Sequence, residues 1–318
     1  MTILIDIEDI YAAQKTIKGI SSRTPLVHSP YLSNAAHSRV SLKLECYQPT
    51  RAFKVRGATN KIRNCPPDKT IVTASSGNHG FAVSYVCSLL GRKAIVCVPT
   101  TANPDKVKAI TAYGAELVKA GEGFEAAYEE AARISQSGAL MVHPFDDPLV
   151  IAGQGTTGVE ILEDLPNADT VIVPIGGGLI SGIAVAVKSL SDSTRVIGVQ
   201  AENAPSMAVA FRTGKPVTVD PKPTLADGMI TKRASERILH LIKKYVDEIV
   251  LVSESDTENA LLTLLREDHI LAEPSGATSV AAILNGQVKA GKENVTVISG
   301  GNISIRYLTQ LLSRTKSN

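Results

Sequence analysis

The sequence contains no tryptophan, and its aromatic residues together make up only 4% of the chain. Proteins that bind single-stranded nucleic acid stack the bases on aromatic side chains, so this composition argues against such a role. The 33 Lys and Arg residues nearly balance 31 Asp and Glu, and the formal net charge is only +2. No strong field attracts nucleic acid or an anionic membrane. We therefore expect neither as a partner.

The sequence also lacks paired cysteines and long apolar runs. Its cysteines show no CxxC spacing, which argues against structural disulfides and against a zinc site. No apolar run reaches the roughly 18 residues of a membrane span. Acidic residues (Asp6, Glu8 and Asp9) stand where a secretory signal peptide carries basic ones. These features predict a cytoplasmic protein with no metal site.

Short β-branched segments alternate with helical segments along most of the 318 residues. This alternation predicts parallel sheets covered on both faces by helices, and hence the α/β class. We expect two α/β domains: a small one over residues 70–145, inserted in a large one formed by 1–69 and 146–318. A ligand would bind in the cleft between them, near the carboxyl ends of strands.

Local patterns predict individual elements. Residues 40–45 alternate apolar and polar side chains, as in a half-buried strand. Ser255, followed three residues later by Glu258, predicts a capping box that opens a helix. The Asp146–Asp147 pair near His143 has no second histidine beside it, so capping of the next helix is a better interpretation than metal binding.

One lysine, Lys54, has neighbours that favour reactivity. It lies between Phe53 and Val55, shortly after a Pro-Thr turn. A solvated lysine has a pKa of about 10.4, and partial burial lowers this pKa so that the amine can form a Schiff base with a carbonyl. Taken alone, Lys54 is more simply explained as a lysine near the start of a surface helix, so its assignment depends on the other motifs.

Three consecutive glycines, Gly176 to Gly178, follow an apolar strand and precede Leu179 in a helix. Glycines let the backbone approach an anion, and the free N–H groups and helix dipole stabilise a phosphate. A tight turn needs fewer glycines. Glu202, about 20 residues onward, leaves a nicotinamide dinucleotide open as an alternative ligand, but Ser181 stands where the last glycine of that fingerprint belongs.

Two further polar clusters follow predicted strands. Ser75, Ser76, Asn78 and His79 stand at a helix start, where hydroxyl, amide and N–H groups suit a carboxylate. Simple capping needs only one serine, although His79 alone would more often be structural. Ser299 places a hydroxyl at the carboxyl end of the last strand, where it can meet a ring nitrogen.

Together and in this order, the motifs resemble the fold-type II pyridoxal-phosphate enzymes, specifically the serine/threonine dehydratase and serine racemase branch. The resemblance extends from Arg23-Thr24-Pro25-Leu26 to Ser299-Gly300-Gly301-Asn302, nearly the whole chain. It implies a tryptophan synthase β-like fold with the active site between two domains. It also implies pyridoxal 5'-phosphate as cofactor, a small amino acid as substrate, and a homodimer or homotetramer.

The resemblance implies a role for each motif. Lys54 would bind the cofactor covalently and serve as the catalytic base, with Phe53 beside the ring. Ser76 would face the substrate Cα opposite Lys54. Asn78 would contact the ring hydroxyl, and Ser299 the pyridine nitrogen. The residues assigned to the phosphate are Gly176, Gly177, Gly178 and Leu179, and those assigned to the substrate carboxylate are Ser75, Asn78 and His79.

The chain departs from the family's usual pattern in several places. Arg51-Ala52 replaces the usual Gly-Ser before the Phe-Lys pair, and the glycine loop is one residue shorter than the usual four. Ala208 stands six residues after Glu202, where racemases of this branch have an acid that binds a divalent ion. Phe145 resembles the dehydratases, because racemases tend to have a polar side chain there.

These features favour a pyridoxal-phosphate enzyme that converts L-threonine or L-serine to a 2-oxo acid and ammonia by β-elimination. A serine racemase and a dehydratase of hydroxyaspartate or another β-hydroxy amino acid are alternatives within the family. A nicotinamide-dependent oxidoreductase and a non-catalytic amino-acid-binding protein are alternatives from other classes.

Overall fold

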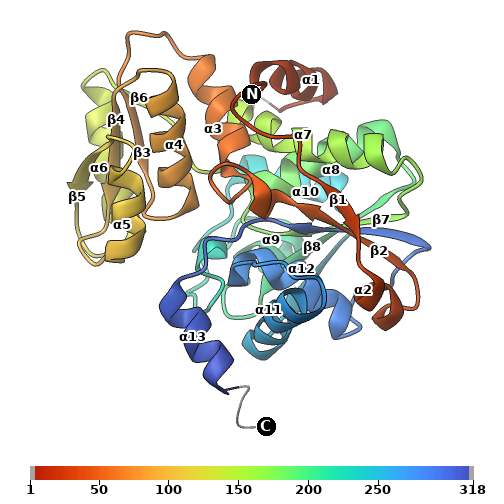
Figure 1. Ribbon diagram of the computed structural model, residues 1–318. Coiled ribbons are helices and arrows are strands. Elements are labelled where there is room, and N and C mark those ends of the chain that lie inside the picture. The colour runs from red at the N-terminus through yellow and green to blue at the C-terminus, as the bar shows by residue number, and fades with distance from the viewer. Residues whose placement is uncertain (1–3, 315–318) are drawn as a thin grey trace.

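The computed structural model describes residues 4–314 and contains two sheets with helices packed on them (Figure 1). The larger sheet has the strand order β1 (Leu26–His28), β2 (Arg39–Leu44), β10 (Glu293–Ile298), β7 (Thr170–Pro174), β8 (Arg195–Ala201) and β9 (Glu248–Val252). The smaller has the order β5 (Glu116–Lys119), β4 (Ala94–Val98), β3 (Ile71–Ala74) and β6 (Leu140–Met141). Paired strands are parallel except β1 and β2, which are antiparallel. The predicted fold of two parallel-sheet α/β units is confirmed, with one antiparallel edge strand.

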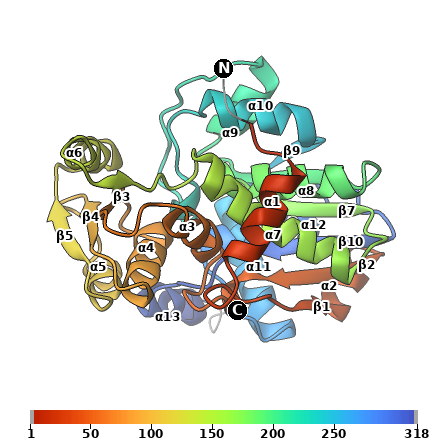
Figure 2. The same ribbon diagram turned by 90° about the horizontal axis from the view of Figure 1, so that it is seen from above.

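Helices cover both faces of the larger sheet, as the view in Figure 2 shows. One face packs against α1 (Ile7–Thr16), α7 (Pro148–Asp164), α8 (Gly178–Leu190), α9 (Ser206–Thr213) and α10 (Glu236–Tyr245). The other packs against α2 (Pro30–Ala35), α11 (Glu254–Glu267), α12 (Pro274–Leu284) and α13 (Ile305–Arg314). Two short 3-10 helices are η1 (Glu45–Tyr47) and η2 (Asp227–Met229). Within residues 4–314, no helix is both long and apolar enough to cross a membrane.

The smaller sheet packs against α6 (Phe124–Gln136) on one face, and α4 (Asn78–Leu89) and α5 (Pro104–Thr111) on the other. A further helix, α3 (Lys54–Arg63), lies between the two sheets (Figure 1). Its Val55, Ala58 and Ile62 belong to the core of the smaller sheet, and it also packs against α7. α3 is thus part of the small unit's core although it precedes residue 70. The predicted domain boundaries stay a prediction.

The strand β2 differs from the half-buried strand that its alternating sequence predicts. Its polar residues Ser41 and Lys43 are as inaccessible as its apolar ones, and Lys43 is 0% exposed. The ammonium of Lys43 lies 2.7 Å from the Glu160 carboxylate on α7. A strand that is buried on both faces can carry a charged side chain when an opposite charge lies beside it.

The helix starts agree with the sequence in one place and differ in another. Asp147 caps α7, as predicted, and Asn103 caps α5. The capping box of α11 is formed by Ser253 and Asp256, two residues before the predicted pair. Both pairs fit the motif, and the earlier one is used because β9 ends directly before Ser253. The strands β5 and β6 were not predicted, since both are short edge strands without a continuous buried run.

Candidate active site

Three of the predicted motifs directly follow parallel strands. Ser75 follows β3, the glycine loop Gly176–Gly178 follows β7, and Ser299 follows β10. Because the carboxyl ends of parallel strands meet at one edge of a sheet, the glycine loop and Ser299 share an edge of the larger sheet. Lys54, the first residue of α3, comes from the segment between the two sheets.

The amine of Lys54 is half-buried and held in place by a main-chain carbonyl. Its Nζ donates a hydrogen bond to the Pro144 oxygen at 2.8 Å and lies 5.0 Å from the centroid of the Phe53 ring. Burial lowers the pKa of Lys54 to about 8, while the carboxylate of Glu273 opposes this shift. An amine with this pKa is unprotonated in an appreciable fraction near neutral pH, as a nucleophile or base requires. The helix that carries it is buried along most of its length, so the surface-helix interpretation is wrong.

Main-chain contacts place Lys54 beside Ser299. The Phe53 N–H donates to the Ser299 carbonyl at 3.1 Å, and Ala52 forms an isolated antiparallel bridge with Gly300. The residue before Lys54 is therefore fixed against the loop that follows β10. Ser299 is only 4% exposed. A cofactor ring in contact with its hydroxyl would therefore be shielded from water there.

The unusual residue Arg51 keeps a glycine-like backbone. Its φ is 57°, in the left-handed region that favours glycine. Its carbonyl accepts a hydrogen bond from the Gly301 N–H at 2.8 Å. The resemblance expects glycine at this position, so the chain retains the local conformation although the residue type differs.

The glycine loop fits an anion such as a phosphate. Gly177 precedes α8 and has a φ of 117°, which side chains rarely permit. A Cβ on Gly178 would lie 3.0 Å from the Phe145 carbonyl oxygen, and one on Gly176 would lie 3.5 Å from that of Gly228. The loop therefore needs glycine most strongly at 177 and 178. Its bare backbone presents the first N–H groups of α8, which have no partner within the helix.

Three residues bear on whether the chain binds a nicotinamide dinucleotide or a metal ion: Ser181, Glu202 and Ala208. The Ser181 hydroxyl donates to the Gly177 carbonyl at 2.9 Å and so supports the loop from within α8. Glu202 is exposed just beyond β8, and Ala208 is a buried apolar residue of α9. Among the residues that the structure describes, no three His, Cys, Asp or Glu side chains are grouped to hold a metal ion.

The two serines of the polar cluster after β3 lie beside the start of α4. α4 begins at Asn78, and its N-cap Gly77 provides no side-chain hydrogen bond. The Ser75 hydroxyl accepts from the Gly77 N–H at 3.2 Å, and Ser76 is half-buried next to it. Neither serine caps the helix. The hydroxyls and the open N–H groups at the start of α4 are thus available to a carboxylate.

The imidazole of His79 is turned into the protein. It is 2% exposed, and its Nε2 lies 3.1 Å from the Val142 carbonyl oxygen, to which Nε2–H donates. Burial lowers the pKa of His79 to about 3, and the charge of Lys54 adds to the effect. A neutral, buried ring attracts no carboxylate by charge. The main-chain N–H of His79, at the start of α4, is the group that suits the predicted contact.

The side chain of Asn78 joins a network that the sequence did not reveal. Its Nδ2 donates to Glu273 Oε1 at 2.6 Å, and its Oδ1 accepts from Asn302 Nδ2 at 2.8 Å. Asn302 also donates to the Thr50 carbonyl at 2.9 Å. Burial, together with the charge of Asp227, raises the pKa of Glu273 to about 7. Glu273 is therefore a titratable group near neutral pH within reach of the predicted site.

From the sequence, Glu273 is no more than a possible helix start facing the cleft. It is the N-cap residue of α12, but its side chain makes no capping hydrogen bond. An acid before a proline is common at helix starts, so only its contact with Asn78, 195 residues away, separates it from an ordinary cap.

We expect Glu273→Gln to change how stability depends on pH. The pKa of Glu273 is raised from 4.5 to about 7 on folding. Its stabilising contribution is therefore fully present below the lower pKa and is lost as pH rises through the upper one. Gln can still accept from Asn78 but does not titrate. In the chain without cofactor, the melting temperature of the variant relative to wild type should rise between about pH 5 and pH 7.5. A difference that stays constant with pH would contradict the assignment, and Asp227→Asn should move the transition to lower pH.

Known proteins resemble this chain over almost its full length. The family described as pyridoxal-phosphate dependent enzyme matches residues 17–300. An L-threonine ammonia-lyase of Thermotoga maritima is 44% identical over 316 residues, which cover 98% of this chain and 79% of that protein. The catabolic L-threonine dehydratase TdcB of Escherichia coli is 40% identical over 315 residues, 96% of each chain.

Solved structures share the fold. A maize serine racemase superposes with a TM-score of 0.93 and 31% identity, over 99% of each chain. A T.th. threonine deaminase superposes with a TM-score of 0.90 and 36% identity, over 95% of this chain and 99% of that one.

Proposed function

The chain belongs to the pyridoxal-phosphate dependent enzymes, and from this premise we propose that it is an ammonia-lyase. It converts L-threonine or L-serine to a 2-oxo acid and ammonia, and it uses pyridoxal 5'-phosphate. The relatives named threonine ammonia-lyase or dehydratase support this substrate class. The threonine deaminase structure is also more similar in sequence than the serine racemase. The observation that carries the proposal is the half-buried Lys54 amine, whose pKa is lowered to about 8.

The surroundings of the site fit the cofactor. Its phosphate would lie on Gly176–Gly178 and Leu179, where the glycine backbone leaves room and N–H groups are open. Lys54 would hold the aldehyde carbon, with Phe53 beside the ring. Ser299 would face the ring nitrogen, and Asn78 the ring hydroxyl. When bound, pyridoxal phosphate draws electrons away from the Cα of an amino acid.

The protein supplies orientation and proton transfer. Ser75, Asn78 and the main-chain N–H of His79 hold the substrate carboxylate at the start of α4. This contact turns the Cα–H bond toward the amine of Lys54. The unprotonated amine removes the Cα proton, and the ammonium formed then protonates the leaving β-hydroxyl, which departs as water. Water completes the release of ammonia and the 2-oxo acid.

The assay that tests the proposal measures 2-oxo acid release from L-threonine, L-serine and the isomers of hydroxyaspartate. We expect release from L-threonine or L-serine, together with a cofactor absorbance band that borohydride bleaches. A bound cofactor without turnover of any of these amino acids would contradict an ammonia-lyase and favour an amino-acid-binding protein. Preferential release from hydroxyaspartate would select the alternative dehydratase.

Ser76→Ala separates elimination from racemisation. The Ser76 hydroxyl is half-buried and does not cap α4, so it is available to the substrate face opposite Lys54. Delivery of a proton from this face is needed to form the D-isomer but not to eliminate water from the L-isomer. We expect racemisation of serine to fall by about 100-fold or more and elimination much less. Chiral chromatography and 2-oxo acid release measure the two, and equal losses would refute this division.

The quaternary structure, location and domain division are part of the same proposal. We propose a cytoplasmic homodimer or homotetramer with a large domain of residues 1–69 and 146–318 and a small domain of 70–145. The four cysteines are all free, as a reducing compartment allows. Light scattering after size-exclusion chromatography would measure the oligomer.

A further inference from the structure

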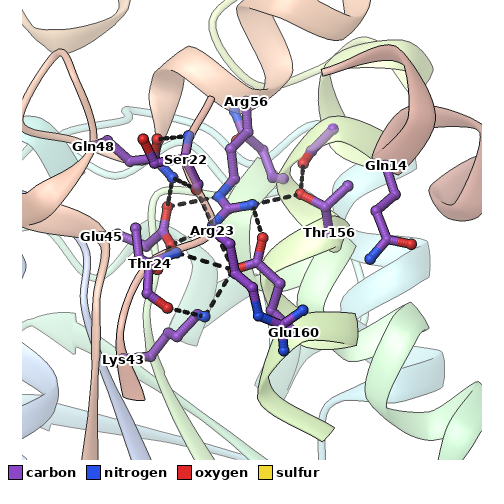
Figure 3. Close-up of polar contacts among 12 residues, drawn as sticks. Gln14, Ser22, Arg23, Thr24, Lys43, Glu45, Gln48, Arg56, Thr156 and Glu160 are labelled. Atoms are coloured by element: carbon purple, nitrogen blue, oxygen red, sulfur yellow. Dashed lines mark hydrogen bonds and ion pairs between the residues drawn. The ribbon is translucent and has the colours of Figure 1, made fainter. Parts of the chain in front are cut away.

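Four buried charged side chains form a network at the first turn of α3, on the side of the helix opposite to Lys54. Figure 3 shows this network in close-up. Its members, here called the Arg56 network, are Lys43 on β2, Glu45 on η1, Arg56 on α3 and Glu160 on α7. The side chains of Lys43, Glu45 and Arg56 are 0% exposed, and that of Glu160 is 6% exposed. Two cations thus face two anions with little contact with water, and the Lys43 ammonium also lies 3.9 Å from the partly exposed Asp164 carboxylate.

The guanidinium of Arg56 binds both carboxylates at once. It donates to Glu45 from Nε and Nη2, both at 2.8 Å. It donates to Glu160 from Nη1 at 2.6 Å and from Nη2 at 2.8 Å. Nη1 also donates to the Thr156 hydroxyl on α7 at 3.0 Å. Such forked contacts fix the direction of a side chain as well as its distance.

Stability alone is a weak explanation for this network. Burying charges costs so much solvation that replacing a buried ion pair with apolar residues is often neutral or stabilising. In some proteins a buried polar or ionic group instead fixes the relative orientation of the elements that it joins. The Arg56 network joins β2, η1, α3 and α7.

The position of Arg56 on α3 links this orientation to Lys54. Successive residues of an α-helix are rotated by about 100°, so Lys54 and Arg56 leave α3 about 200° apart. Lys54 reaches the Pro144 carbonyl, while Arg56 reaches the network on the opposite side. The N-cap Phe53 forms no side-chain cap. The first turn of α3 therefore depends on other contacts for its orientation.

The helices α3 and α7 approach each other closely, because glycines lie at their contact. A Cβ on Gly57 would lie 2.7 Å from the Val150 carbonyl oxygen, and one on Gly153 would lie 2.7 Å from the Gly57 Cα. Glycine surfaces let the two helices approach, and side chains join them beyond Arg56: Gln154 of α7 accepts from the Gly57 N–H at 3.3 Å, and Asn60 of α3 donates to the Leu149 carbonyl at 2.8 Å. Thr156 and Glu160 follow Gly153 on α7 at helical spacings of three and seven residues, so their bonds to Arg56 add the directional restraint.

We propose that Arg56 is a positioning residue for Lys54. By binding Glu45 and Glu160 it sets the rotation of α3 about its axis, and so it places the Lys54 amine against the Pro144 carbonyl. Arg56 itself touches neither substrate nor cofactor. The inference rests on the role of Lys54 in the proposed function, but its test includes a measurement that needs no turnover.

The test compares Arg56→Lys with Arg92→Lys in the full chain. A lysine keeps the charge of Arg56 but cannot hold two carboxylates in a forked geometry. Arg92 is the matched control because it bonds the other end of α3, donating to the Ile62 carbonyl at 2.7 Å. That end lies about 12 Å along the helix from Lys54. Loss of either arginine lowers the melting temperature, but only loss of Arg56 frees the first turn.

Two readouts report the position of Lys54. For Arg56→Lys, kcat of elimination should fall by about 100-fold with KM nearly unchanged, as expected for a misplaced catalytic group.

The second readout is acetylation of Lys54 by acetic anhydride as a function of pH, in the chain without cofactor. Wild type and Arg92→Lys should titrate near the lowered pKa of about 8, and Arg56→Lys closer to 10.5, because the displaced amine meets more water. The titratable groups that face Lys54, namely Glu273, His79 and His143, are the same in all three proteins.

The outcomes separate the two claims. If Arg56→Lys melts earlier but keeps kcat and the acetylation profile of Arg92→Lys, the positioning role is wrong. If wild type shows no elimination, the proposed function fails while the acetylation profile still decides the positioning. Should Arg56→Lys not fold, Glu160→Gln and Thr156→Val remove one charge or one hydrogen bond from the guanidinium. Both variants should shift the acetylation profile in the same direction as Arg56→Lys, but by less. If neither variant shifts the profile, the proposal is overturned.

Discussion

Lys54→Ala is expected to abolish elimination, with kcat lower by about 10²- to 10⁴-fold or more. The substitution removes the group that takes the Cα proton and returns a proton to the leaving hydroxyl. It also removes the amine that would hold the cofactor aldehyde. Release of 2-oxo acid from L-threonine and L-serine measures the loss. Retained turnover would rule out the assigned role of Lys54.

The fold should survive this change, so the loss can be read as chemistry. The side chain of Lys54 is half-buried, and its hydrogen-bond acceptor is the main-chain carbonyl of Pro144. Lys61→Ala is a matched control on the same helix, seven residues after Lys54. The ammonium of Lys61 forms an ion pair with the Asp147 carboxylate at 2.7 Å. We expect Lys61→Ala to keep kcat and both variants to unfold cooperatively. Equal losses of kcat would point to damage of α3 rather than to Lys54.

Gly177→Ala is expected to weaken cofactor binding by about 10- to 100-fold. The φ of Gly177 is 117°, and a side chain in this conformation costs of order 1–3 kcal/mol. The new Cβ would also lie 3.4 Å from Ile238 Cγ2. The loop relieves this strain by turning its N–H groups away from the phosphate. Titration with pyridoxal phosphate, followed by absorbance, measures the affinity.

Gly138→Ala controls for backbone strain alone. Gly138 has a φ of 110°, and nothing lies within 4 Å of the Cβ that alanine would add. It is situated in the turn between α6 and β6, apart from the glycine loop. We expect both alanine variants to melt at a lower temperature and only Gly177→Ala to lose cofactor affinity. Unchanged affinity in Gly177→Ala would contradict the placement of the phosphate.

Comparison of the elements with the sequence shows where prediction succeeds. The strands β3, β4, β7, β8 and β10 are central in their sheets and have short apolar, β-branched runs, the pattern that predicts a buried strand. The edge strand β9 has the same pattern although it is only partly buried. The edge strands β5 and β6 lack this pattern and were missed. The alternation in β2 predicted a polar face, yet Lys43 is buried there by its ion pair with Glu160.

The candidate site shows the same limit. Lys54, the glycine loop and Ser299 are predicted only as a set, because Lys54 taken alone is more simply explained as a lysine near the start of a helix. Their roles stay predictions. Glu273 was not assigned, since an acid before a helix is ordinary. The raised pKa of Glu273 arises only where the folded chain buries it.

The sequence by itself determined the α/β class and the order of the motifs, because strand periodicity, helix starts and glycine clusters are local patterns. The family came from the resemblance of these motifs, taken together, to known enzymes. The tertiary structure decided which charges are buried and what their neighbours are. Arg56 meets Glu160 across 104 residues, and burial lowers the pKa of His79 although its hydrogen bond to Val142, 63 residues away, opposes this shift. Burial and pKa depend on segments brought together only by folding, so no local pattern contains them.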